Sequence, residues 1–112
     1  MNYSVHVPWY ATGFRADKLE AALSEIAPIA LRYGASHYAV YRSHDDRYRF
    51  VQISDFARKQ DWVAYWEGPE FIRFRTVHQS WFQVPILYAA QDLTAEGALP
   101  GAVDVGDIDT VA

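Results

Sequence analysis

The sequence predicts a single α+β domain in which four antiparallel strands form a sheet and the helices cover one of its faces. Its 112 residues leave room for one domain. The composition, 51% hydrophobic and 16% aromatic, lies outside the range of disordered chains. Segments with strand-like alternation and helix-like spacing follow one another in the order βαββαβ. That order is typical of the split βαβ arrangement, called ferredoxin-like.

The first strand and the first helix are predicted from the N-terminal third of the chain. Residues 3–12 are rich in aromatic and β-branched side chains and read as a strand that Gly13 closes. Apolar residues at helical spacing predict a helix over residues 16–33, with Gly34 as its stop. Pro28 lies within that run, so we expect it to kink the helix or to remove one backbone hydrogen bond.

The remaining elements complete the pattern. Residues 36–43 and 48–56 read as strands joined by a polar turn, which predicts a hairpin. A helix is expected from about Lys59 until Gly68-Pro69 breaks it, and Pro69 suits the first turn of a further helical piece that runs to about Gln79. Residues 84–93 are predicted to form the last strand.

The chain is expected to divide into a folded part, residues 1–94, and a C-terminal tail, residues 95–112. The tail has glycine, proline, small residues and acids without an apolar period, which predicts a mobile segment. In the folded part, residues 38–42, 48–52 and 86–90 carry apolar or aromatic side chains on both faces of their strands. Something must cover the face that has no helices. A second copy of the chain is the simplest cover, since most small oligomers are two-fold dimers.

Charge and cysteine content exclude several classes of function. The net charge is −4, but no Lys or Arg follows Asp92, so the acidity sits in the tail and the folded part is near neutral. No basic face is available for a phosphate backbone, and nucleic acid is not an expected partner. The absence of cysteine excludes thiolate metal sites and cysteine nucleophiles. No signal peptide and no membrane-spanning run is visible, so we expect a soluble cytoplasmic protein.

Residues 56–71 carry a resemblance to a known family. Phe56 ends a predicted strand, Trp62 follows six residues on, and Gly68-Pro69-Glu70-Phe71 reopens a helix. This pattern resembles the antibiotic-biosynthesis-monooxygenase family of dimeric α/β barrels, and with the element order the resemblance covers about residues 3–93. It implies a homodimer that forms a barrel from two sheets. That superfamily includes cofactor-free quinone-forming oxygenases, haem-degrading enzymes, decarboxylases, isomerases and members with no assigned reaction.

Position by position, the resemblance does not favour haem chemistry. Many members have His where this chain has Tyr65. Haem-degrading relatives have Trp at that position, a His ten residues later as the iron ligand, and an Asn on the first strand near His6. Here the ligand position holds Arg75, whose guanidinium stays protonated and cannot bind iron. His78, one helical turn further on, could substitute only if the helix were shifted. We therefore predict no cofactor.

Six residues are candidates for a site. Trp62 and Trp66 lie four apart on one helix face and could stack a flat ligand, or they could simply pack the helix on the sheet. Arg75 and His78 could hold a phenolate, enolate or carboxylate, or they could form a solvated helix face. In the enzymatic scheme His6 or His78 removes a phenolic proton, Arg75 holds the anion, and Tyr65 and Trp66 position the ring.

Two functions remain open from the sequence. One is a homodimeric protein that binds a small planar aromatic molecule, as a cofactor-independent monooxygenase of a phenol or quinol would. The alternative is a non-catalytic ligand-binding or interaction domain whose aromatic residues form its core. No metal-ligand spacing, phosphate loop or nucleophile elbow is present. A cavity with two or more convergent polar groups would favour the enzyme, and a filled interior would favour the alternative.

Overall fold

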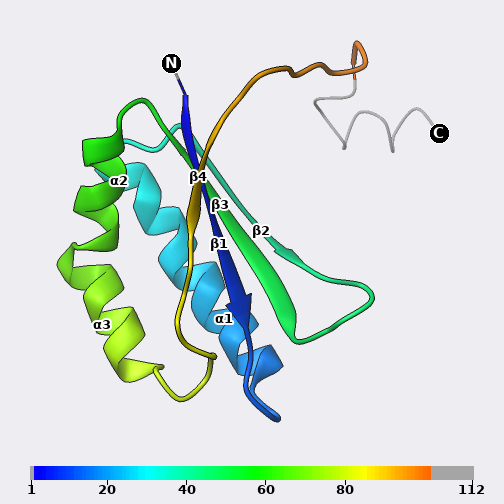
Figure 1. The fold of residues 1–112 in the computed structure, drawn as a ribbon, viewed down its shortest axis with the longest axis vertical. Coiled ribbons are helices and arrows are strands. Elements are labelled where there is room, and N and C mark those ends of the chain that lie inside the picture. The colour runs from blue at the N-terminus through cyan, green and yellow to red at the C-terminus, as the bar shows by residue number, and fades with distance from the viewer. Residues whose placement is uncertain (1, 102–112) are drawn as a thin grey trace.

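The computed structural model describes residues 2–101 and has the predicted order of elements. They are β1 (Tyr3–Tyr10), α1 (Ala16–Ile26), the 3₁₀ helix η1 (Ala27–Tyr33), β2 (His37–Arg42), β3 (Arg49–Phe56), α2 (Lys59–Trp66), α3 (Pro69–Val77) and β4 (Ala89–Asp92). The strands form one antiparallel sheet in the order β2-β3-β1-β4. All helices lie on one face of it (Figure 1). The predicted α+β ferredoxin-like fold is therefore confirmed.

Pro28 ends the regular helix, as the sequence predicted. α1 stops at Ile26, and the chain continues as 3₁₀ helix η1 with Pro28 in its first turn. Proline lacks the N–H that an α-helix needs at this point, and the tighter 3₁₀ turn accommodates that loss. Gly34 then takes a positive φ of 99°, a conformation that glycine adopts without steric cost, and leads the chain into β2.

The core lies between the sheet and the helices. Val5, Val7 and Trp9 of β1 point to the helices and are at most 1% exposed. Their neighbours on β3 that face the same way include Phe50 and Phe56, both buried. Large rings from α2, α3 and the chain after α3 fill the remaining space. Burial of this much apolar surface is the main source of the stability of the fold.

A buried polar chain crosses this core. The Trp9 indole donates to Oε1 of Gln52 at 3.1 Å, and Nε2 of Gln52 donates to the Tyr65 hydroxyl at 3.1 Å. That hydroxyl in turn donates to the carbonyl of Ile26 at 2.7 Å. The side chains of Trp9, Gln52 and Tyr65 are thus paired with one another, and the chain of hydrogen bonds links β1, β3, α2 and the end of α1.

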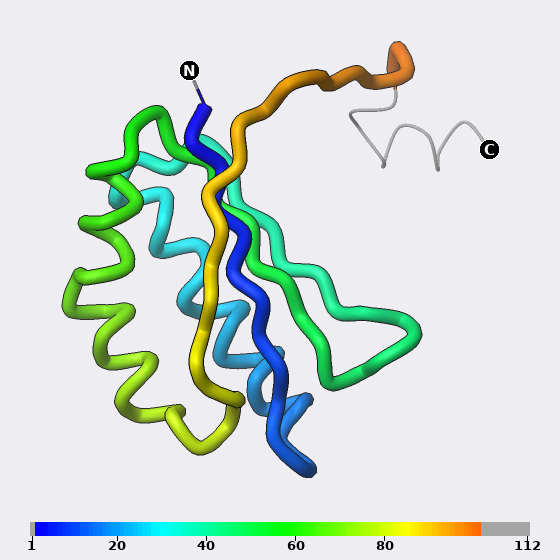
Figure 2. Tube along the Cα trace, in the orientation of Figure 1, coloured from blue at the N-terminus to red at the C-terminus, as the bar shows by residue number. Residues whose placement is uncertain are grey.

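The last strand is shorter than the sequence predicted. A strand over residues 84–93 was expected, whereas β4 spans only Ala89–Asp92. Closer to α3 the chain makes one isolated bridge, between Phe82 and Ala11, the residue that follows β1. Residues 84–88, here called the strap, run alongside β1 without pairing to it (Figure 2). Pro85 in the strap and Pro8 on β1 have no N–H to give to a ladder, which explains the gap.

The other face of the sheet, here called the open face, carries no described helix, and residues 93–96 border only one end of it, beside Ser4 and His6. It carries an apolar centre, with Ala39, Val51, Ile53 and Pro8 on adjacent strands. Beyond β4, residues 93–101 leave the body of the molecule and are exposed (Figure 1). Most of the predicted tail, residues 102–112, lies outside the described part of the chain.

Candidate functional site

An indole–guanidinium stack joins α2 to α3. The rings of Trp62 and Trp66, one turn apart on α2, lie 5.2 Å apart with their planes 25° from parallel. The guanidinium of Arg75, on α3, lies 4.0 Å from the centre of the Trp66 ring. Its carbon is also 5.2 Å from the Phe71 ring, one turn earlier on α3. This order, Trp62–Trp66–Arg75, is here called the stack, and it brings together three of the six predicted site residues.

The charge in the stack is poorly compensated. Nη1 of Arg75 is buried, and no residue in the range 2–101 accepts a hydrogen bond from it. Burial lowers the pKa of the guanidinium, while the nearby Glu67 acts in the opposite direction. Arginine remains charged through such a shift. The cation–π contact with Trp66 offsets part of the free-energy cost of removing the guanidinium from water. One N–H donor of this charged group still has no hydrogen-bond acceptor in the described chain.

Trp62 and Tyr65 lie deep in the core. Both are fully buried, and Tyr88 packs edge-on against the Trp62 ring at 4.9 Å. The Tyr65 hydroxyl is engaged with Gln52 and Ile26, and burial raises the pKa of this phenol well above its usual range. The Trp62 indole N–H is different, since it is buried without an acceptor in the described chain.

His78 follows α3 and lies at a separate groove. Its ring packs 4.2 Å from Trp81 and 5.2 Å from Phe74, and its Nδ1 is buried without a partner among residues 2–101. The groove, about 360 Å³ in volume, runs between α1 and α3 and is open to solvent. Glu25 and Arg73 lie on its walls, but Arg75 does not. His78 and Arg75 therefore share a helical segment without facing the same cavity.

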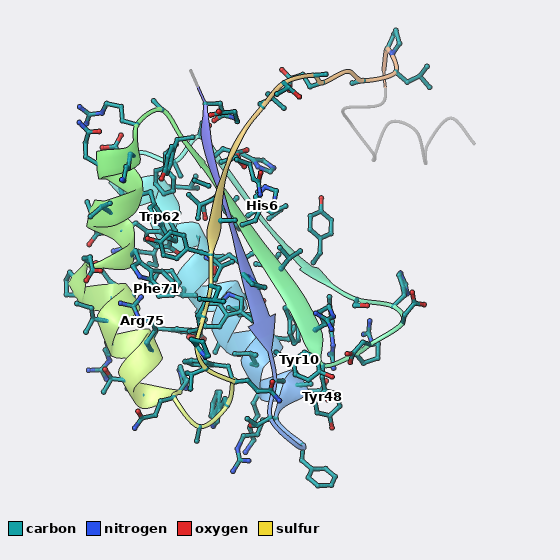
Figure 3. All side chains as sticks on the ribbon, in the orientation of Figure 1. His6, Tyr10, Tyr48, Trp62, Phe71 and Arg75 are labelled. Carbon is teal, nitrogen blue, oxygen red and sulfur yellow. The ribbon has the colours of Figure 1, made fainter. Side chains whose placement is uncertain are left out.

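His6 lies on the opposite side of the sheet from Arg75. It alternates along β1 with the buried Val5 and Val7, so its ring lies on the open face, where Nε2 is 3.2 Å from Oγ of Ser4 (Figure 3). Within one chain the sheet separates His6 from the stack. The six sequence candidates thus fall into four places: the stack, the core position of Tyr65 beside it, the groove at His78 and the open face at His6.

Sequence reasoning missed Tyr88 and Trp81. Tyr88 contacts both indoles of the stack, at 4.9 and 5.3 Å, and Trp81 packs on His78. Tyr88 fell within the last strand predicted over residues 84–93, and Trp81 fell between the predicted helical piece and that strand. The Val-Pro pair at residues 84–85, unsuited to the middle of a sheet, was the one signal that this segment leaves the ladder.

Comparisons with known proteins place the fold. No family model and no curated protein matches the sequence. Among solved structures, a "putative antibiotic biosynthesis monooxygenase" from Nitrosomonas europaea superposes with a TM-score of 0.76 at 19% identity, covering 86% of this chain and 94% of that one. A protein of the same description from Bordetella bronchiseptica gives 0.73 at 17% identity, covering 84% and 98%.

A third match has an assigned activity. A mutant of SnoaB, a cofactor-independent oxygenase from Streptomyces nogalater, superposes with a TM-score of 0.70 at 16% identity and covers 88% of this chain and 97% of that one. Identities this low establish likeness of fold and leave the activity open. No described helix is long and apolar enough to cross a bilayer. The chain therefore has the ferredoxin-like fold of the antibiotic-biosynthesis-monooxygenase structures, as the resemblance in its sequence implied.

Proposed function

We propose that the protein binds a small planar aromatic anion beside Arg75 and acts as a cofactor-independent monooxygenase of a phenol or quinol. The observation that carries the proposal is the buried, unpaired Nη1 of Arg75 above the Trp66 ring. Buried polar groups in native proteins are almost always satisfied, and an exception points to a missing ligand, ion or water. An oxyanion on a flat ring would satisfy both the donor and the charge.

For the oxidation of a phenol by O₂ without a cofactor, the protein needs only to bind the substrate and to remove its proton. Loss of a proton from a bound phenol gives an anion with carbanion character, and O₂ adds to the ring carbon. Loss of water then leaves a carbonyl, so that one oxygen atom is retained, the other leaves as water, and the substrate supplies all four electrons. Arg75 would hold the anion. Of the two predicted bases, only His78 lies on the helix side of the sheet, as Arg75 does. Because His78 faces the separate groove, proton transfer to it from a substrate held by Arg75 requires the end of α3 to move.

Binding is tested by replacing Arg75. The probe is 2-hydroxy-1,4-naphthoquinone, a planar anion at neutral pH, whose binding should quench the fluorescence of the stacked indoles. Arg75→Met should weaken binding by about 10- to 100-fold, the scale of one charged hydrogen bond. Arg32→Met is the matched control, since it removes the same charge at an exposed position of η1 that borders neither the stack nor the groove, and it should leave the affinity unchanged. Equal affinities of the two variants would refute the site.

Catalysis is tested separately with 1,8-dihydroxyanthrone. The wild-type protein should consume one O₂ per anthrone converted to the quinone, at a rate above the uncatalysed reaction, and His78→Ala should lower kcat more than it raises KM. Rapid binding without any increase in oxygen uptake would support the second candidate function below.

The second candidate is a non-catalytic binding or interaction domain. The observation in its favour is the filled interior, since Trp62, Tyr65 and Phe71 are fully buried and packed against one another. Under this proposal the aromatic residues stabilise the fold, and Arg75 is a structural cation that rests on Trp66. Arg75→Met would then leave the Tm unchanged or raise it, and addition of the naphthoquinone probe would shift the Tm of neither the wild type nor the variant.

A further inference from the structure

The strap, residues 84–88, is held at its two ends and not along its length. Before it, Phe82 pairs with Ala11, and the N–H of Gln83 donates to the carbonyl of Tyr10 at 2.8 Å. After it, the β4 ladder with β1 begins at Ala89. No backbone hydrogen bond joins the strap to the sheet in the described structure, so local opening of this segment breaks none of the ladder.

The strap places one ring against the stack. Tyr88 packs edge-on to Trp62 at 4.9 Å and to Trp66 at 5.3 Å, and it is 40% exposed. Trp66 is the same indole on which Arg75 rests. The Tyr88 ring therefore covers part of both indoles on the side of the strap, where Trp62 is fully buried and Trp66 is half-buried.

The two ends of the stack carry buried donors without acceptors. Nε1 of Trp62 and Nη1 of Arg75 both lack a partner within residues 2–101. On the strap side, the ring of Tyr88 is the group that packs against both indoles. The arrangement in the structure thus leaves two hydrogen-bond donors unused, which costs free energy that an occupied site would recover.

We propose that Tyr88 is the gate of the Arg75 site and that the strap carries its ring aside when a planar anion binds. This inference rests on the proposed function. Room for the movement exists, because a hollow of about 230 Å³ separates the strap from β1, with Pro8 and Trp9 on one wall and Val84 and Leu87 on the other. Both strap side chains in that wall are largely exposed, so few contacts hold them.

The gate is tested with opposing substitutions in the full chain. Tyr88→Ala should increase the accessibility of the indoles to acrylamide quenching in the absence of ligand. It should also raise the association rate of 2-hydroxy-1,4-naphthoquinone by about tenfold or more. In the wild type the probe binds only to the open state, so a small population of that state lowers both the observed association rate and the apparent affinity. Tyr88→Trp, a larger ring, should slow association. Tyr88→Phe keeps the ring, and Leu31→Ala removes an exposed apolar side chain on η1, away from the strap, so both should behave as the wild type.

The outcomes separate the gate from the site. If the wild type binds the probe in an Arg75-dependent way while Tyr88→Ala and Tyr88→Trp bind at the wild-type rate, the gate is refuted and the site stands. Unchanged acrylamide quenching in Tyr88→Ala also refutes the gate, with no reference to any ligand. If neither the wild type nor Tyr88→Ala binds the probe, the Arg75 site fails and the gate fails with it.

Discussion

Tyr65 shows how a residue chosen for its chemistry can have a structural role. Its position in the sequence suggested a hydroxyl that donates to a substrate. In the structure that hydroxyl donates to the Ile26 carbonyl and accepts from Gln52, at the point where α1 gives way to η1. This phenol is fully buried, and its hydroxyl already donates one hydrogen bond and accepts another. It can therefore donate to a ligand only if the core opens.

The substitution Tyr65→Phe tests this assignment. Removing the hydroxyl leaves the Ile26 carbonyl and the Gln52 amide buried without partners, so the free energy of unfolding should fall by about 1–3 kcal/mol. Denaturant titration measures the change, and Tyr38→Phe, at an exposed tyrosine, should shift it by less than about 0.5 kcal/mol. A loss of probe affinity without loss of stability would instead assign the hydroxyl to the ligand.

At the scale of the elements, the contact between η1 and α3 depends on a phenol–carboxylate hydrogen bond. The Tyr33 hydroxyl donates to Oε1 of Glu70 at 2.5 Å, close to the start of α3. Gly68 permits this approach, because a Cβ there would lie 2.6 Å from the Tyr33 oxygen and 2.7 Å from the carbonyl of Ala64. Any larger residue at position 68 would push η1 away from α3.

This contact makes stability depend on pH in a defined direction. The hydrogen bond from Tyr33 is the main cause that lowers the pKa of Glu70. Because the folded-state pKa lies below the unfolded one, the stabilisation is complete above the unfolded value and is lost as the pH falls through the folded value. Tyr33→Phe should therefore reduce stability most near neutral pH, with the difference from the wild type shrinking in acid. A difference that stays constant from pH 7 to pH 2 would contradict the linkage.

The elements that were predicted well are those with a local signal. Pro28 marked the end of α1, and Gly68-Pro69 marked the break between α2 and α3, within a residue or two of the observed bounds. The last strand was overestimated because apolar residues 84–88 read as a strand, while the missing ladder depends on Pro8, distant in sequence. The geometry of the site was harder to predict than the elements. The face of β1 on which His6 lies depends on how the strand is placed in the sheet. No short sequence pattern indicates that Arg75 stacks on Trp66 or that Tyr88 contacts Trp66.

At the scale of the whole molecule, the open face predicts a dimer. We propose that two copies pack these faces together as a barrel, burying about 1,200–2,000 Å² or more in total. Val51 lies near the centre of that face, opposite Pro8 on one side and Tyr41 on the other. Val51→Lys places an unpaired charge in the interface and should shift the mass at micromolar concentration from dimer towards monomer, measured by light scattering.

The matched control is Val63→Lys, which makes the same change at an exposed position on α2, away from the sheet. It should leave the mass unchanged. A wild-type protein that is monomeric at micromolar concentration would rule out the dimer. A dimer that survives Val51→Lys would place the interface elsewhere on the surface.

The parallel indoles of α2 also give the protein an optical signature of its own. Two indoles 5.2 Å apart and 25° from parallel are close enough for their electronic transitions to couple, which splits their absorption and produces a paired band of opposite signs in circular dichroism. Because Arg75 and Tyr88 both touch Trp66, any rearrangement of either alters that coupling. The state of this region can thus be followed in solution with unlabelled protein.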